Sequence, residues 1–468
     1  MSTAQAFDFI IIGGGSAGYA AARTARAFSK SIAIVDGAEP LGGLCILRGC
    51  MPSKTLIYAA EVLHHAQAAE SFGLDIPSAS VNIKALHARK KKIINEFSSY
   101  RQEQLASGTF TLFHSHAHFI SKNEIKLEDG THLKAKKFLI STGSRVNQPS
   151  VPGLKDAPQL TSDEILDLDF VPESVIVLGG GVVACELAQF LKRIGSDVIQ
   201  IQRSPHILKE ASPEAATVIE QAFRDSGIKL YVDTTINSIE TIAEGCQVNF
   251  QHEDKPCIAK AKYLFNALGR VPNVESLDLD KANVTCRATG HIEANRFQQT
   301  SNPNIYTAGD CAGPHEIVHI AIMQGECAAR HAFDQPTTPL DYDSVLKVIF
   351  TDPQVASVGF SEKDLLDKNT PYLKAEYPFS DHGKSILMEA TYGYVKVFAD
   401  PKLGSILGAE CVGKDASELI HPLSIALALG ASVQDLLKAH WYHPTLSEIW
   451  TYPLEDIADE IKKNQREP

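Results

Sequence analysis

The chain has 468 residues, of which 44% are hydrophobic and 21% charged, and its net charge is −12. These values predict a soluble globular protein of about three domains. The acidic balance disfavours nucleic acid and anionic membranes as main partners, because both reward basic surfaces. No apolar run is long enough to cross a bilayer, and no signal segment precedes the first apolar strand. We therefore expect a cytoplasmic protein.

Residues 7–36 are predicted to form a strand, a Gly-rich turn, a helix and a second strand. The turn reads Gly13-Gly14-Gly15-Ser16-Ala17-Gly18. Gly13 permits the tight turn, Gly15 lets the backbone approach a pyrophosphate, and Gly18 lets the helix pack on the strand. Asp36 ends the second strand, where a carboxylate binds the ribose hydroxyls of an adenosine. The unit predicts a dinucleotide site; the alternative is a Gly-rich turn without a ligand.

The next segment, residues 37–52, is predicted to be irregular and contains Gly43, Cys45 and Cys50. Most of the nine cysteines stand singly in apolar surroundings and read as small hydrophobes. Cys45 and Cys50 are separated by four residues on a bend made flexible by Gly49, so they can close a small disulfide. A helix N-terminus beside them would favour the thiolate. A metal site is disfavoured, since no further Cys or His stands at ligand spacing.

Helices are predicted over residues 53–70 and 82–107, and short strands follow to about residue 140. The basic run at residues 89–92 reads as a solvated helix face. His114, His116 and His118 alternate and would share one face of a strand. No partnering Cys or Asp repeat accompanies them, so we assign no metal to them.

A second strand–turn–helix–strand unit spans residues 174–203. Its turn reads Gly179-Gly180-Gly181-Val182-Val183-Ala184. No acidic residue stands at the end of its second strand; Arg203 is there instead, with Lys209 six residues on. Arg and Lys attract a 2′-phosphate that a carboxylate would repel. We therefore favour NADP(H) over NAD(H); the alternative is that both are ordinary surface charges.

Two such units predict an α/β fold with two Rossmann-like dinucleotide-binding domains. Gly269 stands where the chain leaves the second unit and is a further candidate cofactor contact. From about residue 341 alternating strands precede helices without a nucleotide signature. We expect a first dinucleotide-binding domain in two parts (1–150 and 271–340), an NAD(P)-binding domain (151–270) and a C-terminal α+β domain (341–468).

The cysteine segment strongly resembles the active-site loop of class I pyridine nucleotide–disulfide oxidoreductases, and the resemblance covers essentially the whole chain. It implies that the two-part domain binds FAD and that the C-terminal domain is a dimerisation domain. It also implies that Cys45 exchanges with substrate while Cys50 contacts FAD. Lys54 looks like the flavin-side lysine of the family, paired with Glu186 of the second domain. Ser141-Thr142-Gly143 resembles the short motif that links the FAD and NAD(P) domains of the family. Thr307-Ala308-Gly309-Asp310 resembles its second FAD fingerprint, in which Asp310 would bind the ribityl chain.

A second part of the resemblance lies at residues 443–448, which read His443-Pro444-Thr445-Leu446-Ser447-Glu448. Thiol–disulfide exchange needs a group that takes and returns a proton, and histidine titrates in a suitable range. The catalytic His-Glu dyad of the family has this spelling. It implies that His443 is the acid/base, that Glu448 orients it, and that the dyad serves the disulfide of the other subunit of a homodimer.

The resemblance leaves the substrate open. No cysteine follows Cys411, which argues against mercuric ion, and Glu326 would repel a carboxylate of glutathione. The site motifs look most like dihydrolipoyl dehydrogenase, although Leu47-Arg48 replaces the usual Asn-Val. We expect an FAD-dependent enzyme that exchanges electrons between NAD(P)H and a small disulfide or dithiol. Glutathione-reductase-like and mercuric-reductase-like enzymes are the alternatives, and a flavin-based redox sensor is the alternative of another class.

Overall fold

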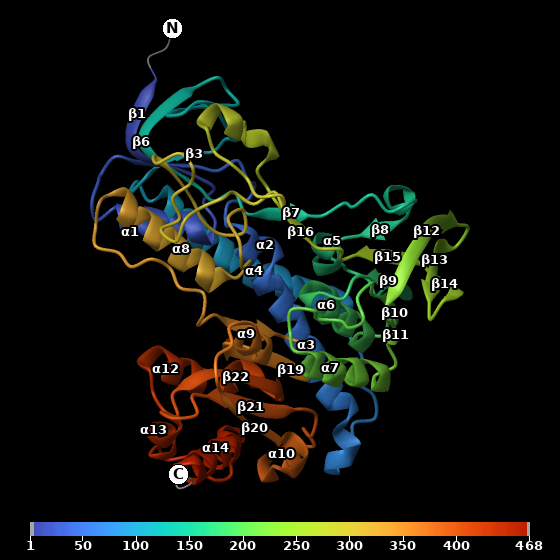
Figure 1. Ribbon diagram of the computed structural model, residues 1–468. Coiled ribbons are helices and arrows are strands. Elements are labelled where there is room, and N and C mark those ends of the chain that lie inside the picture. The colour runs from blue at the N-terminus through green and yellow to red at the C-terminus, as the bar shows by residue number, and fades with distance from the viewer. Residues whose placement is uncertain (1–3, 466–468) are drawn as a thin grey trace.

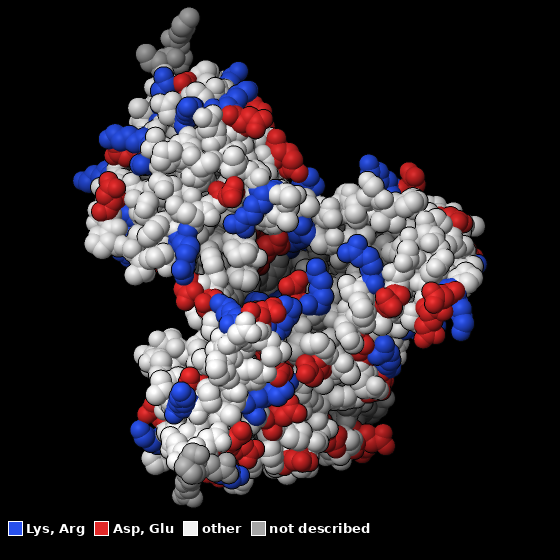
Figure 2. Space-filling view, viewed as in Figure 1, with Lys and Arg blue, Asp and Glu red and all other residues white. Residues whose placement is uncertain are grey.

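The computed structural model describes residues 4–465 and has three groups of elements, joined by the long helices α3 and α4 (Figure 1). Charged side chains of both signs are intermixed over the face in Figure 2, which is hollowed near its centre. Among residues 4–465, no helix is both long and apolar enough to cross a membrane. The joining helices are α3 (Cys50–Gln67) and α4 (Ile83–Ala106), and the short helix α2 (Leu44–Arg48) packs against both.

The first group is a seven-stranded sheet with the order β3-β2-β1-β6-β5-β4, to which β17 adds beside β6. Its strands β1, β2, β3, β6 and β17 are parallel to their neighbours. The apolar run at residues 9–12 is buried on both faces, as expected of a parallel sheet covered by helices. The elements are β1 (Gln5–Ile12), α1 (Ser16–Ala25), β2 (Ile32–Val35), β3 (Thr111–Phe113), β4 (Ala117–Ser121), β5 (Glu124–Leu127), β6 (His132–Ile140), β17 (Ile305–Thr307) and α8 (Val318–Ala332).

The second group is a five-stranded parallel sheet with the order β11-β10-β9-β15-β8. A three-stranded antiparallel sheet, β12-β13-β14, packs beside it, and the pair β7–β16 lies between the first two groups (Figure 1). The elements are β7 (Ser144–Val146), β8 (Gln159–Leu160), α5 (Ser162–Leu166), β9 (Ser174–Leu178), α6 (Val182–Arg193), β10 (Asp197–Ile201), α7 (Pro213–Asp225), β11 (Lys229–Tyr231), β12 (Thr234–Ile242), β13 (Gly245–His252), β14 (Lys255–Ala261), β15 (Tyr263–Asn266) and β16 (Arg270–Pro272).

The third group is a five-stranded antiparallel sheet with the order β18-β19-β22-β21-β20, covered by helices. Its core includes the fully buried Trp450, whose indole N–H donates to the Leu419 carbonyl. The elements are β18 (Leu346–Ile349), β19 (Gln354–Gly359), α9 (Glu362–Asp367), β20 (Leu373–Pro378), η5 (Phe379–Asp381), α10 (Gly383–Leu387), β21 (Tyr394–Ala399), β22 (Ile406–Gly413), α11 (Ala416–Leu419), α12 (His421–Leu429), α13 (Val433–Leu437), η6 (Leu446–Trp450) and α14 (Thr451–Asn464). Two Rossmann-like sheets followed by an α+β unit confirm the predicted fold class.

Candidate active site

The two cysteines of the predicted redox pair lie at the junction of two helices. Cys45 belongs to the one-turn helix α2, and Cys50 is the first residue of α3. The expectation of an irregular segment through residue 52 is therefore wrong from residue 44 onward. Gly49 separates the helices, and a Cβ there would lie 3.0 Å from the Leu44 carbonyl oxygen. The break at Gly49 places the Cys50 thiol at the N-terminus of an 18-residue helix, where a thiolate is favoured.

The two thiols are partly buried and form no disulfide here. Their pKa values are shifted in opposite directions. A hydrogen bond from Cys45 lowers the pKa of Cys50 to about 7, and the Lys54 ammonium acts in the same direction. The same hydrogen bond raises the pKa of Cys45, and burial raises that pKa further. Above pH 7 the pair therefore consists of a thiolate at Cys50 and a thiol at Cys45, which needs a base before it can attack.

A buried carboxylate, Glu186 of α6, connects the cysteine helix to the other two groups of elements. The Lys54 ammonium donates to Glu186 Oε2 at 2.7 Å, and the backbone N–H of Phe350 donates to Oε1 at 2.9 Å. Lys54 also lies 4.7 Å from the centroid of the Phe350 ring. Since Glu186 is only 4% exposed, both donors offset the cost of burying its charge. The pairing of Lys54 with Glu186 was expected from sequence, whereas the contact of Phe350 was missed because nothing around residue 350 signals it.

The first Gly-rich turn is closely packed where glycine is required and open where a ligand would approach. A Cβ on Gly13, whose φ is +101°, would lie 2.3 Å from the Ser141 carbonyl oxygen. At Gly15 the nearest atom would be 3.8 Å away. Asp36 Oδ2 accepts a hydrogen bond from the backbone N–H of Gly14 at 2.7 Å, which fixes the carboxylate beside the turn. The turn thus presents backbone N–H groups and the start of α1 to a phosphate.

The other predicted FAD residues gather beside this turn, at the carboxyl ends of β1, β6 and β17. Ile12, Ile140 and Thr307, which end these strands, are paired in register. The hydroxyl of Thr142 is buried without a hydrogen-bond partner, and Asp310 accepts from Ser144 at 2.6 Å. The remaining residues of this group are Ser16, Gly18, Gly43, Gly143 and Gly309. An open turn, a helix N-terminus and an unpaired hydroxyl at one sheet edge fit a flavin dinucleotide.

The second Gly-rich turn repeats this geometry with one change. A Cβ on Gly179 would lie 2.5 Å from the Ala267 carbonyl oxygen, and a Cβ on Gly181 would contact nothing within 4 Å. The side chain of Gln202 lies against Gly180 as that of Asp36 lies against Gly14. An uncharged amide thus occupies the position that the Asp36 carboxylate has in the first turn.

Two cations stand beside this amide. Arg203 and Lys209 are exposed. Lys209 lies 3.6 Å from Glu210, and no salt bridge of Arg203 is found in the described part of the chain. Gly269 follows β15 with φ +96°, and a Cβ there would contact nothing within 4 Å.

The predicted acid/base pair is assembled in the third group. His443 Nδ1 lies 2.9 Å from Oε2 and 3.0 Å from Oε1 of Glu448. The His443 side chain is 79% exposed, whereas that of Glu448 is 12% exposed. All hydrogen bonds of the His443 ring within residues 4–465 go to Glu448. In Figure 1 the neighbouring helices α13 and α14 lie at the opposite end of this group from α2. The imidazole is therefore held by a largely buried carboxylate but open to an external reactant.

Comparison with known proteins assigns this arrangement to a family. The family described as pyridine nucleotide-disulphide oxidoreductase matches residues 7–325, and its dimerisation domain matches residues 345–453. The chain belongs to the pyridine nucleotide–disulphide oxidoreductase family. It is an FAD-dependent oxidoreductase that acts on sulfur groups, and it uses FAD and a pyridine nucleotide as cofactors.

Relatives within this family carry different activities. A dihydrolipoyl dehydrogenase of Chlamydia muridarum is 32% identical over 450 residues, which are 95% of this chain and 96% of the relative. A mercuric reductase of Bacillus cereus is 32% identical over 443 residues, which are 94% of this chain and 70% of the relative. The crystal structure of LpdA from Mycobacterium tuberculosis has a TM-score of 0.85 at 25% identity, covering 96% of this chain and 99% of that one. A flavoprotein disulfide reductase of Escherichia coli, RclA, shares the fold, with a TM-score of 0.84 at 22% identity over 96% of this chain and 99% of that one.

Two other sequence features, Arg48 and the histidines at positions 114, 116 and 118, make contacts outside the cysteine pair and the dyad. Arg48 of α2 lies 3.3 Å from Asp163 of α5, so its charge is partly engaged outside the cysteine pair. His114 Nε2 hydrogen-bonds the Ala38 carbonyl at 2.8 Å. His114 and His116 lie between β3 and β4, so the three histidines do not share one strand. Over the described residues, no cluster of three or more His, Cys, Asp or Glu side chains suits a metal ion.

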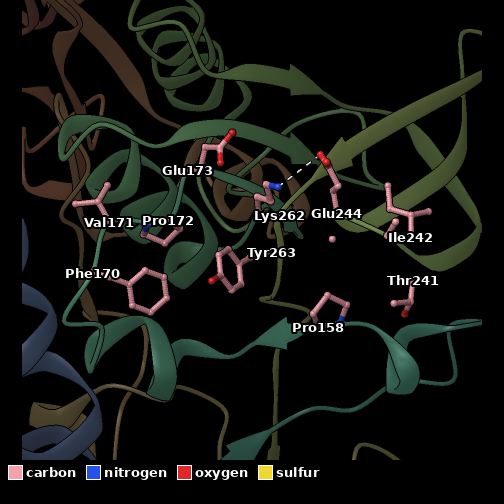
Figure 3. Close-up of a pocket in the computed structure, with 12 residues that line it drawn as sticks. Pro158, Phe170, Val171, Pro172, Glu173, Thr241, Ile242, Glu244, Lys262 and Tyr263 are labelled. Carbon is pink, nitrogen blue, oxygen red and sulfur yellow. Dashed lines mark ion pairs between the residues drawn. The ribbon is translucent and has the colours of Figure 1, made fainter.

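A surface cleft of about 680 Å³ lies beside the three-stranded sheet of the second group (Figure 3). Phe170, Tyr263 and Pro158 line it, and Lys262 pairs with Glu244 across one side at 3.6 Å. None of the residues predicted for cofactor binding or catalysis lines this cleft. We place the chemistry at the cysteine pair, because the thiolate and its charged partners are there.

Proposed function

We propose that this chain reduces a small disulfide with NADPH, or oxidises the corresponding dithiol, and that a dihydrolipoamide-type compound is its substrate class. The observation that carries this proposal is the placement of Cys45 and Cys50 at the junction of α2 and α3, where the hydrogen bond from Cys45 and the charge of Lys54, which is paired to Glu186, lower the pKa of Cys50. FAD, when bound, supplies a ring that accepts a hydride from the nicotinamide and passes two electrons to the Cys45–Cys50 disulfide. We assign residues 1–150 and 271–340 to the binding of FAD and residues 151–270 to that of the nicotinamide.

The reduced pair then carries out the thiol chemistry. His443 takes the proton of Cys45, and the resulting thiolate attacks one sulfur of the substrate, so that a mixed disulfide forms and a thiolate leaves. The His443 imidazolium returns the proton to that thiolate. Cys50 attacks the Cys45 sulfur, which breaks the mixed disulfide and restores the Cys45–Cys50 disulfide. The second substrate thiolate takes a proton from water, so NADPH, one proton and one disulfide give NADP⁺ and two thiols.

We further propose that the His443 of this reaction belongs to the partner subunit of a homodimer. The exposed imidazole on its largely buried carboxylate supports this proposal, because a base that serves its own chain would be expected beside Cys45. The match of residues 345–453 to a dimerisation domain supports it as well. Two equivalent sites would then form, each from the cysteines of one protomer and the dyad of the other.

The proposed preference for NADPH depends on Gln202 and Arg203 beside the second turn. Changing Arg203→Glu should lower kcat/KM for NADPH by about 10–100-fold, the effect of losing one or two charge-assisted hydrogen bonds to a 2′-phosphate. Activity with NADH should change little. Steady-state kinetics with both nicotinamides measure this shift. Lys255→Glu, the same charge change at an exposed residue of β14, is the control. A wild-type enzyme that already prefers NADH would contradict the proposal.

The substrate is tested by one panel. Purified enzyme with FAD is assayed with lipoamide, glutathione disulfide, mercuric ion and quinones, each with NADPH and with NADH. We expect the highest kcat/KM with lipoamide. Mercuric ion is the second candidate, because a mercuric reductase is as similar in sequence as the dihydrolipoyl dehydrogenase. Preference for mercuric ion, or flavin reduction without turnover of any disulfide, would contradict the proposed function.

A further inference from the structure

A second histidine, His382, lies behind the dyad. It stands between η5 and α10, and its ring is 0% exposed. Its Nδ1 lies 2.8 Å from the Ser385 hydroxyl, and its Nε2 lies 3.5 Å from Glu448 Oε1. The other oxygen of Glu448 is the one nearest to His443 Nδ1, at 2.9 Å. Ser385, His382, Glu448 and His443 therefore form a line that runs from a buried serine to an exposed imidazole.

The contacts of His382 define its tautomer. A neutral imidazole carries one proton, on either Nδ1 or Nε2. A proton on Nδ1 would leave the lone pair of Nε2 facing a carboxylate. If the proton is on Nε2 instead, this N–H is a donor directed toward Glu448, and Nδ1 can accept a hydrogen bond from the Ser385 hydroxyl. The favoured arrangement is thus Ser385 donating to His382 and His382 donating toward Glu448.

The surroundings of His382 favour a role toward Glu448 over simple packing. Its Nε2 is buried and makes no well-formed hydrogen bond, because 3.5 Å is long for one. A buried N–H without a partner costs free energy, and the Glu448 carboxylate is the acceptor it faces. The ring of Tyr452 packs edge-on against it, and that ring in turn stacks on Tyr377. Burial lowers the pKa of His382, which favours the neutral ring. A neutral His382 does not compete with His443 for the negative charge of Glu448.

We propose that His382 is a positioning residue of the acid/base dyad: its Nε2–H restrains the Glu448 carboxylate, which holds the His443 imidazole in place. This inference rests on the proposed role of His443. The sequence does not indicate this role, because His382 lies far from Glu448 along the chain and belongs to no recognised motif. The contacts of Tyr452 of α14 with Tyr377 of β20 and with His382 bring this histidine to Glu448.

The test uses two substitutions that separate donor from packing. In His382→Gln the side-chain amide can keep an N–H near the position of Nε2. In His382→Asn the shorter amide can keep only the contact with Ser385. We expect His382→Asn to lower kcat for disulfide reduction by up to about tenfold, because Glu448 loses the N–H that faces it, and at 3.5 Å this contact is longer than a full charged hydrogen bond. His382→Gln should retain most of the activity. Reduction of bound FAD by NADPH, which does not use His443, should be unchanged in both.

A second readout reports on the histidines directly. In protein with ¹⁵N-labelled histidine, nitrogen chemical shifts should show His382 as the Nε2–H tautomer, and His382→Asn should alter the Nδ1–H resonance of His443. Equal loss of activity in the Asn and Gln variants, or an unaltered His443 resonance in the Asn variant, would overturn the inference. A wild-type enzyme that reduces no disulfide would contradict the proposed function instead, and the resonances would still decide the role of His382.

Discussion

Replacing Cys50 with serine should abolish the long-wavelength charge-transfer absorbance that appears when the wild-type enzyme takes up two electrons. That absorbance requires a thiolate beside the flavin, and a serine hydroxyl stays protonated near neutral pH. Disulfide reduction should fall by roughly 10³-fold or more, because Cys50 can no longer release the mixed disulfide. Anaerobic titration with NADPH measures the absorbance, and steady-state assays measure the turnover. Survival of the band in Cys50→Ser would contradict the assignment of Cys50.

The same band should depend on pH in a defined direction. The pKa of Cys50 is lowered to about 7, so the thiolate dominates above pH 7 and is lost as the pH falls below it. Cys45→Ala removes the hydrogen bond that contributes most to this lowering, and the band of that variant should fade at a higher pH. Cys45→Ala should also lack disulfide reduction while keeping the band, which makes it the matched control for Cys50→Ser.

The parts of the site that sequence could predict are local in the chain. Gly13 and Gly179 precede helices that start a few residues later, and their positive φ values permit no other residue without strain. Continuous apolar runs before each turn indicate buried parallel strands. A short segment therefore contains the information for each phosphate-binding turn, and the fold class follows from finding two of them. The family resemblance then predicts the order of the remaining motifs.

The parts that sequence missed depend on contacts between distant segments. The backbone N–H of Phe350 reaches Glu186 only because β18 packs beside α6, and a backbone donor leaves no mark in the sequence. His382 reaches Glu448 because α14 packs against β20 and Tyr452 of α14 contacts the His382 ring. The helical turn of α2 was missed because a Gly-rich segment favours irregular structure, whereas here tertiary contacts stabilise one turn of helix between Gly43 and Gly49.

Replacing His443 with glutamine should lower disulfide reduction by about 10²–10⁴-fold, the usual contribution of a general acid/base. The pKa of Cys45 is raised by its hydrogen bond to Cys50 and by burial, so this thiol depends on a base more than an ordinary cysteine does. Flavin reduction by NADPH and the charge-transfer band should remain, since neither requires proton transfer from Cys45 to the dyad. Loss of flavin reduction in this variant would indicate a general structural defect instead.

If His443 serves the cysteine pair of the partner subunit, heterodimers of two inactive variants should regain activity. Cys45→Ser and His443→Gln homodimers should each be inactive in disulfide reduction. In a heterodimer of the two, one site combines the intact cysteines of one chain with the intact dyad of the other, and the second site lacks both. Purified heterodimers carrying two different affinity tags should therefore regain about half of the wild-type activity per dimer, because one of the two shared sites is whole. If each chain used its own dyad, both sites of the heterodimer would be defective, and mixing would restore nothing.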